Sequence, residues 1–340
     1  MKLHEKYIKR CIQLAKNGFG STYPNPMVGC VIVHNGLIIG EGWHQKAGEP
    51  HAEVNAIRSV KDQTLLKEST IYVSLEPCSH FGKTPPCCDL IIAKDIPNIV
   101  VGTVDPFAKV AGEGIRRLKE AGKNVTLGVL QQECAELNKR FFTFHNKNRP
   151  YIILKWAETT DGFIAPESKL KQQPVWITNA FSRQMVHRWR SEEQAILIGT
   201  QTAIDDNPSL TTREWAGKNP LRIVVDSHGR IPKENHIFDN QAKTTVLSAA
   251  EINFEENIPA QIAECLFKNH IQSVIIEGGR QTIQTFIDSG MWDEARIFKG
   301  NKTFEKGLKS PVITGTIMSK QTILEDELLI LTNDDQHNYF

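Results

Sequence analysis

Two stretches decide the fold of the first half of the chain: His51-Ala52-Glu53 and Pro77-Cys78-Ser79-His80-Phe81-Gly82-Lys83-Thr84-Pro85-Pro86-Cys87. One imidazole and two thiolates make a three-ligand zinc site whose fourth tetrahedral position stays open for water. Two thiolates balance the divalent charge, yet the metal still lowers the pKa of its water enough to give hydroxide near neutral pH. The pattern therefore predicts a catalytic Zn²⁺ centre on His51, Cys78 and Cys87.

Glu53 supplies the acid–base group that such a centre needs. It lies two residues beyond His51, so in the first turn of a helix it faces the open position without becoming a ligand. A carboxylate there takes the proton from the water and delivers it to a ring nitrogen and a departing amine. The order His-x-Glu followed by Pro-Cys is that of the zinc deaminases.

The spacing of the cysteines departs from the short deaminase form, because eight residues instead of two separate Cys78 from Cys87. Cys88 is an alternative ligand, although Cys87 is preferred because it directly follows Pro85-Pro86. Taken singly, a His-x-Glu is most often a surface helix start, and paired cysteines are most often buried thiols. The joint pattern favours zinc catalysis. The non-enzymatic alternative is a closed structural zinc site with His80 or Cys88 as fourth ligand.

The pattern around these stretches predicts a layered α/β domain. An amphipathic helix ends near Gly18, and Asn35-Gly36 between two apolar runs indicates a hairpin. Strands alternate with helices after it. The expected strands are 28–33, 37–40, 70–75, 98–102 and 125–129, and the expected helices are 3–15, a segment from His51, one from about Pro86, 112–121 and 133–145.

The polar stretch Asn146-Lys147-Asn148-Arg149-Pro150 is the best domain boundary. We expect domains at residues 1–146 and 150–340, with boundaries good to a few residues. The second domain is again α/β, with strands at 151–156, 195–199, 221–226, 244–248 and 273–277 and a helix at 180–191.

Composition narrows the class of protein. The 340 residues carry 40 Lys and Arg against 39 Asp and Glu, which argues against a broad basic nucleic-acid-binding face. The sequence contains no apolar run of membrane-spanning length and no signal-peptide start, so a soluble cytoplasmic protein is expected. Seven cysteines in a chain of this length do not indicate a disulfide framework.

The first half resembles the bifunctional riboflavin-biosynthesis deaminase/reductase family, RibD. The resemblance rests on Ser74–Cys87, on Tyr23-Pro24-Asn25-Pro26-Met27-Val28-Gly29-Cys30 and on Gly42-Trp43-His44. It implies a cytidine-deaminase-like α/β/α zinc domain in which His51, Cys78 and Cys87 hold zinc and Glu53 moves protons. It also implies that a pocket for a small phosphorylated pyrimidine is lined by Asn25, His44, His80 and Lys83.

Two glycine segments are candidates for phosphate binding. Gly112-Glu113-Gly114-Ile115-Arg116-Arg117 lacks the third glycine of a dinucleotide fingerprint. Ile275-Ile276-Glu277-Gly278-Gly279-Arg280-Gln281-Thr282 is the better candidate, because it runs from a β-rich segment through two glycines into a predicted helix. Exposed amides at a helix start favour a phosphate, although Gly-Gly is also an ordinary turn.

The second half resembles the reductase domain of the same family, on Lys155-Trp156-Ala157, Thr160-Asp161-Gly162, Val175–Thr178, Ile198–Thr202, Asp205–Thr211 and Val225-Asp226-Ser227. This implies a dihydrofolate-reductase-like α/β domain that uses NADPH. The cofactor positions it implies are Ala157, Trp176, Thr202, Asp206, Ser227 and the loop Gly279–Thr285, which includes Arg280, Gln281 and Thr282. The substrate positions are Lys155, Arg190, Leu210, Arg213 and Glu277, and Lys155 and Glu277 are candidate proton donors.

Three features depart from the family pattern. Pro174 stands where a serine is usual, so contact there is limited to the backbone. The loop 165–173 is longer than is typical, and residues 309–340 match weakly.

The resemblance implies zinc-hydroxide deamination of a diaminopyrimidine phosphoribosylamine, followed by NADPH reduction of its ribosyl group to ribityl. A homodimer or homotetramer without nucleic-acid or membrane partners is expected. The alternative is a base, nucleoside or tRNA deaminase whose second half is a non-catalytic binding domain.

Overall fold

The computed structural model describes residues 2–81, 85–107, 111–168 and 172–334. These residues divide into two units, with the division between Lys147 and Asn148. Both units are built of helices packed on a central sheet, so the predicted α/β class is confirmed.

A five-stranded sheet in the order β2-β1-β3-β4-β5 forms the centre of the first unit. The strands are β1 (Gly29–His34), β2 (Leu37–Trp43), β3 (Thr70–Leu75), β4 (Asn98–Thr103) and β5 (Asn124–Leu127). The predicted hairpin joins β1 to β2. The pairs β1–β2 and β1–β3 are antiparallel, whereas β3–β4 and β4–β5 are parallel. Because β3 and β4 are parallel, the loops that follow them leave the sheet at the same edge.

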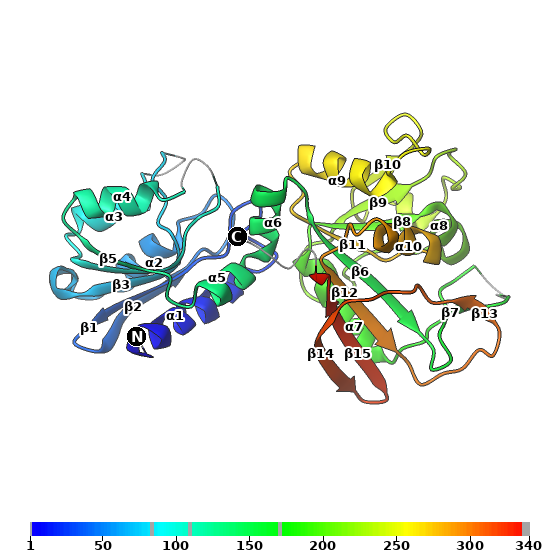
Figure 1. Ribbon diagram of the computed structural model, residues 1–340, viewed down its shortest axis with the longest axis horizontal. Coiled ribbons are helices and arrows are strands. Elements are labelled where there is room, and N and C mark those ends of the chain that lie inside the picture. Colours follow the sequence, from blue (N-terminus) through cyan, green and yellow to red (C-terminus); the bar gives the residue numbers. More distant parts are fainter. Residues whose placement is uncertain (1, 82–84, 108–110, 169–171, 335–340) are drawn as a thin grey trace. The chain divides into compact units, whose positions relative to one another are not determined.

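Helices cover both faces of this sheet. They are α1 (Lys2–Ala15), α2 (Ala52–Ser59), α3 (Cys87–Ala93), α4 (Glu113–Glu120), α5 (Gln131–Leu137) and α6 (Lys139–Lys147). Alternate residues of β1 enter two different cores: Cys30 and Ile32 pack with α2, α3 and α4, whereas Val31 and Val33 pack with α1 and α5. Figure 1 shows α3 and α4 on one side of the sheet and α1 and α5 on the other.

The predicted single helix over 133–145 is wrong, because the chain forms α5 and α6 with a break at Asn138. The Asn138 side chain accepts from the Met27 amide and donates to the Met27 carbonyl, at 2.8 Å each. The break in the helix therefore coincides with hydrogen bonds between Asn138 and the distant backbone of Met27. Local periodicity of the sequence does not reveal such a break.

An eight-stranded sheet in the order β10-β9-β8-β11-β6-β12-β15-β14 forms the second unit. Its strands from β10 to β12 are parallel, and β15 and β14 close it antiparallel. The strands are β6 (Tyr151–Glu158), β8 (Ala195–Gly199), β9 (Leu221–Val225), β10 (Thr244–Leu247), β11 (Ser273–Ile276), β12 (Glu294–Lys299), β14 (Thr316–Ile323) and β15 (Asp326–Thr332).

The remaining elements of the described part of this unit are four α-helices, a short 3-10 helix (His236–Phe238) and a small two-stranded sheet. The helices are α7 (Ala180–Glu192), α8 (Thr200–Asp206), α9 (Ile258–Lys268) and α10 (Arg280–Asp288), and β7 (Phe163–Pro166) pairs with β13 (Gly307–Lys309). The carboxyl ends of β6, β8, β9 and β11 are neighbours in the sheet, and α8 and α10 begin directly beyond β8 and β11. Ligands of open α/β sheets bind at such an edge.

Candidate active sites

The predicted metal ligands converge in the first unit. Nδ1 of His51 lies 3.5 Å from Sγ of Cys78 and 3.4 Å from Sγ of Cys87. Tetrahedral zinc with its usual bond lengths places N and S ligands roughly 3.5 Å apart, so the residues present fit that ion. His51 precedes α2, Cys78 follows β3, and Cys87 is the first residue of α3.

The three ligand atoms form the metal-binding group found in the described parts of the chain, and Sγ of Cys88 is not one of them. Cys88 is buried, and its thiol donates to Asp89 at 3.6 Å. Within those same residues, no fourth protein ligand atom joins the group. The geometry therefore favours Cys87 over Cys88, and an open site over a closed one.

Glu53 lies buried beside the ligands, in the first turn of α2. Burial, reinforced by the charge of Cys78, raises its pKa to about 7. The hydrogen bonds of Cys78 with Cys87 and His51 lower the pKa of Cys78 to about 4, against the effect of burial. These pKa values are those of the zinc-free chain; the buried carboxyl group beside the ligands is placed to accept and to release a proton when zinc is bound.

Asn25 and His44 reach the same place from another part of the chain. The rings of His44 and His51 lie 5.3 Å apart. Nδ1 of His44 lies 3.2 Å from the Pro50 carbonyl, which can only accept, so Nε2 accepts from the Asn25 amide at 3.1 Å. Burial lowers the pKa of His44, which favours this neutral form. The two side chains form one polar wall next to the metal ligands.

The remaining residues predicted for this pocket are less well placed. His80 is exposed, with its ring 6.3 Å from that of Phe107. Lys83 lies outside the described residues. Ser79, which directly follows Cys78, was not predicted as a site residue. Its buried hydroxyl has no hydrogen-bond partner in the described structure.

A cavity of about 1590 Å³ lies in the second unit, at the carboxyl edge of its sheet. All cofactor and substrate positions predicted for this unit except Gln284 line it. They include Lys155, Ala157, Trp176, Arg190, Thr202, Asp206, Leu210, Arg213, Ser227, Glu277, Gly279, Arg280, Gln281 and Thr282. Pro174 lines the cavity as well.

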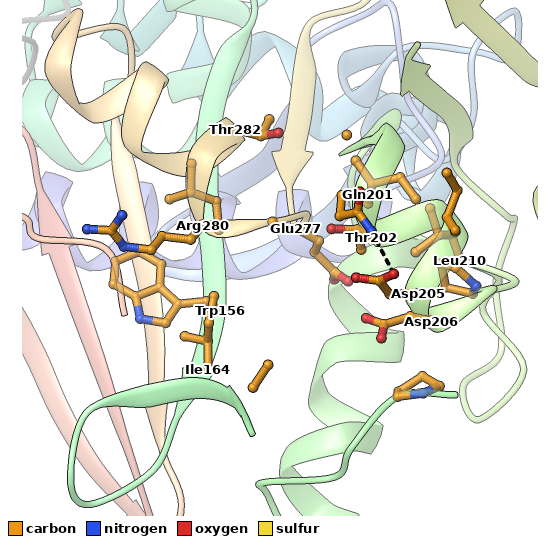
Figure 2. A pocket seen from close by; sticks show the side chains of 18 of the residues that line it. Trp156, Ile164, Gln201, Thr202, Asp205, Asp206, Leu210, Glu277, Arg280 and Thr282 are labelled. Atoms are coloured by element: carbon orange, nitrogen blue, oxygen red, sulfur yellow. Dashed lines mark hydrogen bonds between the residues drawn. The ribbon is translucent and has the colours of Figure 1, made fainter. Parts of the chain in front are cut away.

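Figure 2 shows Glu277 pointing into this cavity, with Trp156 and Arg280 on one side and Asp206 and Leu210 on the other. Nη2 of Arg190 donates to the Glu277 carboxylate at 2.8 Å. Burial by itself would raise the pKa of Glu277, but the charges of Arg190 and Lys155 lower it to about 2. Burial lowers the pKa of Lys155.

Polar groups without partners mark where a ligand fits. Nε of Arg190, Oε1 of Glu277 and Nε of Arg280 are buried and unpaired in the described structure. Leaving such groups unsatisfied costs about 1–3 kcal/mol each, so a polar ligand would stabilise the cleft. Two guanidinium groups that donate hydrogen bonds and one carboxylate that accepts them suit phosphate and hydroxyl groups.

The glycine loop packs tightly against β8, at the start of α10. A Cβ on Gly278 would lie 2.5 Å from Cβ of Ile198, and Gly279 has a φ of +67°. The loop brings the first amides of α10 to the cavity, where they can meet an anion. The cavity therefore has the features that a dinucleotide and a phosphorylated substrate require.

Arg183 and His187 are two of the lining residues that were not predicted from the sequence. Together with Arg190 they stand at i, i+4 and i+7 on α7, so helical spacing was the signal that would have found them. Burial and the charges of Arg190 and Arg213 lower the pKa of His187 to about 4. Its Nδ1 donates to the Thr211 carbonyl, next to Leu210.

Comparison with known proteins gives a consistent result for both units. Residues 1–103 match the family model of the cytidine and deoxycytidylate deaminase zinc-binding region, and residues 150–325 match the RibD C-terminal domain. These matches confirm the predicted fold class. No helix among the described residues has the length and apolar character needed to cross a membrane.

Whole-length relatives carry both units. The riboflavin biosynthesis protein RibD of Aquifex aeolicus is 38% identical over 90% of this chain and 89% of its own length. RibD of Escherichia coli is 36% identical over 96% of this chain and 86% of its own length. A crystal structure of a diaminohydroxyphosphoribosylaminopyrimidine deaminase/5-amino-6-(5-phosphoribosylamino)uracil reductase from Thermotoga maritima superposes with a TM-score of 0.87. It is 34% identical, and the match covers 98% of this chain and 99% of that one.

Proposed function

Because the chain belongs to the RibD family of riboflavin biosynthesis proteins, we propose that its two units act in succession on one phosphorylated pyrimidine. It is a bifunctional enzyme with a zinc-dependent deaminase domain and an NADPH-dependent reductase domain. The substrate we propose is 2,5-diamino-6-(5-phosphoribosylamino)pyrimidin-4-one. We assign deamination to residues 1–146 and reduction to residues 150–340.

For the deaminase, the convergence of His51, Cys78 and Cys87 beside a buried Glu53 is the observation that carries the proposal. Zinc held by these ligands supplies a Lewis acid that lowers the pKa of bound water. Glu53 takes one proton from the attacking water and passes it to the ring nitrogen, and then transfers the second proton of that water to the amino group, which leaves as ammonia. Asn25 and His44 hydrogen-bond the pyrimidine edge, and His80 and Lys83 are assigned to the ribose phosphate.

For the reductase, the lining of the second-unit cavity supports the assignment. NADPH supplies the hydride that reduces C1′ of the open-chain sugar imine. The segment Gly279–Thr285, predicted as a loop, is in the structure the N-terminal part of α10 with its preceding glycine, and we assign it to the cofactor phosphates. Arg190 and Arg213 hold the substrate phosphate. The pKa of about 2 keeps Glu277 a carboxylate near neutral pH, so Lys155 is the better of the two candidate proton donors.

One experiment tests both steps: the diaminopyrimidine is supplied with and without NADPH, and the products are identified by mass. Without NADPH we expect a gain of about one mass unit, because a hydroxyl replaces an amino group. With NADPH we expect about two more, from one hydride and one proton. An unchanged mass in both arms overturns the assignment, whereas activity on cytidine or tRNA alone favours the base-deaminase alternative.

From the family we also infer a cytoplasmic homodimer or homotetramer. Light scattering of the purified chain tests the oligomeric state, and a monomer at micromolar concentration contradicts it.

A further inference from the structure

Helix α4 touches the chain on both sides of Cys78, and this contact is not used by the chemistry above. The helix and its N-cap residue Gly112 carry the Gly112-Glu113-Gly114 stretch that resembles an incomplete dinucleotide fingerprint. In the structure this stretch lies in the first unit, against the residues that flank the first zinc-ligating cysteine. The cavity of about 1590 Å³ lies in the other unit.

The first contact is made by Glu76, two residues before Cys78. Its buried carboxylate accepts the backbone N–H groups of Gly112 and Gly114 at 2.9 Å, of Ile115 at 3.2 Å and of Asp105 at 3.3 Å. The amides at a helix start otherwise lack partners, and a negative charge is favoured there. Glu76 thus ties the end of β3 to the start of α4 and to the loop after β4.

The second contact is a close backbone approach at Pro77. A Cβ added to Gly114 would lie 2.2 Å from the Pro77 carbonyl oxygen, well inside van der Waals contact. Glycine at 114 therefore lets the helix lie directly on the peptide that precedes Cys78.

The third contact is made by Arg117, one turn along α4. Nη1 of Arg117 donates to the Ser79 carbonyl at 2.8 Å, and Nη2 donates to the Asp89 carboxylate. Ser79 directly follows Cys78, and Asp89 lies in α3 two residues after Cys87. One guanidinium group therefore connects the segment of the first cysteine with the helix of the second.

We propose that α4 fixes the separation of Cys78 and Cys87, with Glu76 and Arg117 as positioning residues of the zinc centre. This inference rests on the proposed zinc site and adds to it the groups that hold two of its ligands. Replacement of residues that orient metal ligands typically weakens metal affinity or activity by about 10- to 100-fold. The effect arises because a displaced ligand loses the tetrahedral geometry that zinc prefers.

The test compares Arg117→Met with Arg116→Met in the full chain. Arg116 is a matched control, because it is the preceding residue of the same helix and its ion pairs to Glu113 and Glu120 lie on the surface. Zinc affinity is measured by competition with a chromogenic chelator, and ligand geometry by the visible spectrum after replacement with Co²⁺. We expect Arg117→Met to bind zinc about 10- to 100-fold more weakly with an altered Co²⁺ spectrum, and Arg116→Met to match the parent.

A second pair of variants guards against misfolding. Glu76→Gln keeps the shape of the side chain but removes its charge, and we expect it to weaken zinc binding as well. Arg117→Lys restores one donor, and we expect it to recover part of the affinity. NADPH-dependent reduction of the deaminated substrate, measured on the same samples, should stay at the parent level.

The outcomes separate this inference from the function on which it rests. If the parent chain neither binds zinc nor deaminates, the proposed function fails. If the parent does both, while Arg117→Met and Glu76→Gln keep its zinc affinity and Co²⁺ spectrum, only the positioning role fails. Loss of folding in both variants also overturns it, since the contacts would then be merely structural.

Discussion

Replacing Glu53 by glutamine should strongly slow deamination while leaving zinc binding and reduction intact. Glutamine has the shape of glutamate, so the buried site in the first turn of α2 keeps its packing. Losing the group that transfers the protons should lower kcat of deamination by about 10²- to 10⁴-fold. That loss corresponds to about 3–5 kcal/mol in the activation free energy.

The same substitution should raise the free energy of unfolding of the zinc-free chain. The size of this gain follows from the pKa of the buried Glu53 carboxyl group. Burial raises the pKa of Glu53 from 4.5 to about 7. At 1.36 kcal/mol per pKa unit, ionising this group costs the zinc-free fold about 3 kcal/mol. For an acid with a raised pKa, the cost is absent below the unfolded-state pKa and complete above the folded-state pKa. The stability advantage of zinc-free Glu53→Gln over the parent should therefore grow from about zero at pH 4.5 to about 3 kcal/mol at pH 7 and above.

The assay is urea unfolding of the zinc-free chain at several pH values, with Glu68→Gln as the control. Glu68 is an exposed glutamate of the same unit, so its substitution should leave the free energy of unfolding within about 0.5 kcal/mol at every pH. A stability difference for Glu53→Gln that does not change with pH would refute the reasoning. Wild-type deamination by this variant would refute the assignment of Glu53.

Three further predictions address the separation of the two sites and the reductase cleft. Removing zinc with a chelator should stop deamination and leave NADPH-dependent reduction unchanged; loss of both activities would count against independent sites. Glu277→Gln should lower the free energy of unfolding by about 3 kcal/mol near neutral pH, because the charges of Arg190 and Lys155 hold the pKa of Glu277 at about 2 instead of 4.5. This difference should vanish as the pH falls from 4.5 through 2, and a pH-independent difference in denaturant titrations would contradict it. Gly279→Ala should weaken NADPH binding roughly tenfold, since a left-handed φ of +67° costs a side chain about 1–2 kcal/mol; an unchanged Kd in a fluorescence titration would be evidence against the loop as cofactor site.

The local pattern of apolar and turn residues was enough to predict most strands and helices in the centres of the two sheets. The Asn35-Gly36 hairpin and the apolar strands of both sheets occur as expected, because each depends on turn chemistry and residue alternation close in sequence. The elements β12, β14 and β15 at the end of the chain were not predicted. β14 is an edge strand with exposed residues along both faces, so it carries no alternating pattern from which to predict it.

The candidate sites were likewise predicted in part from the sequence and in part only from the structure. Residue type and order alone were sufficient to nominate His51, Glu53, Cys78 and Cys87, because zinc chemistry restricts its ligands to few residue types. The choice between Cys87 and Cys88 needed the coordinates, since adjacent residues in the first turn of a helix point in different directions.

What the sequence by itself determined is the chemistry: a zinc-ligand set with an acid–base carboxylate, and two α/β halves joined by a polar segment. Only the tertiary structure decided which distant groups surround that chemistry. The ion pair of Arg190 with Glu277 spans 87 positions, and the contact of Arg117 with Ser79 spans 38. Such pairs are created by sheet order and helix packing, and no local propensity encodes them. For this reason the sequence of Gly112–Arg117 resembles an incomplete nucleotide-binding motif, whereas in the structure the same segment contacts the residues on both sides of Cys78.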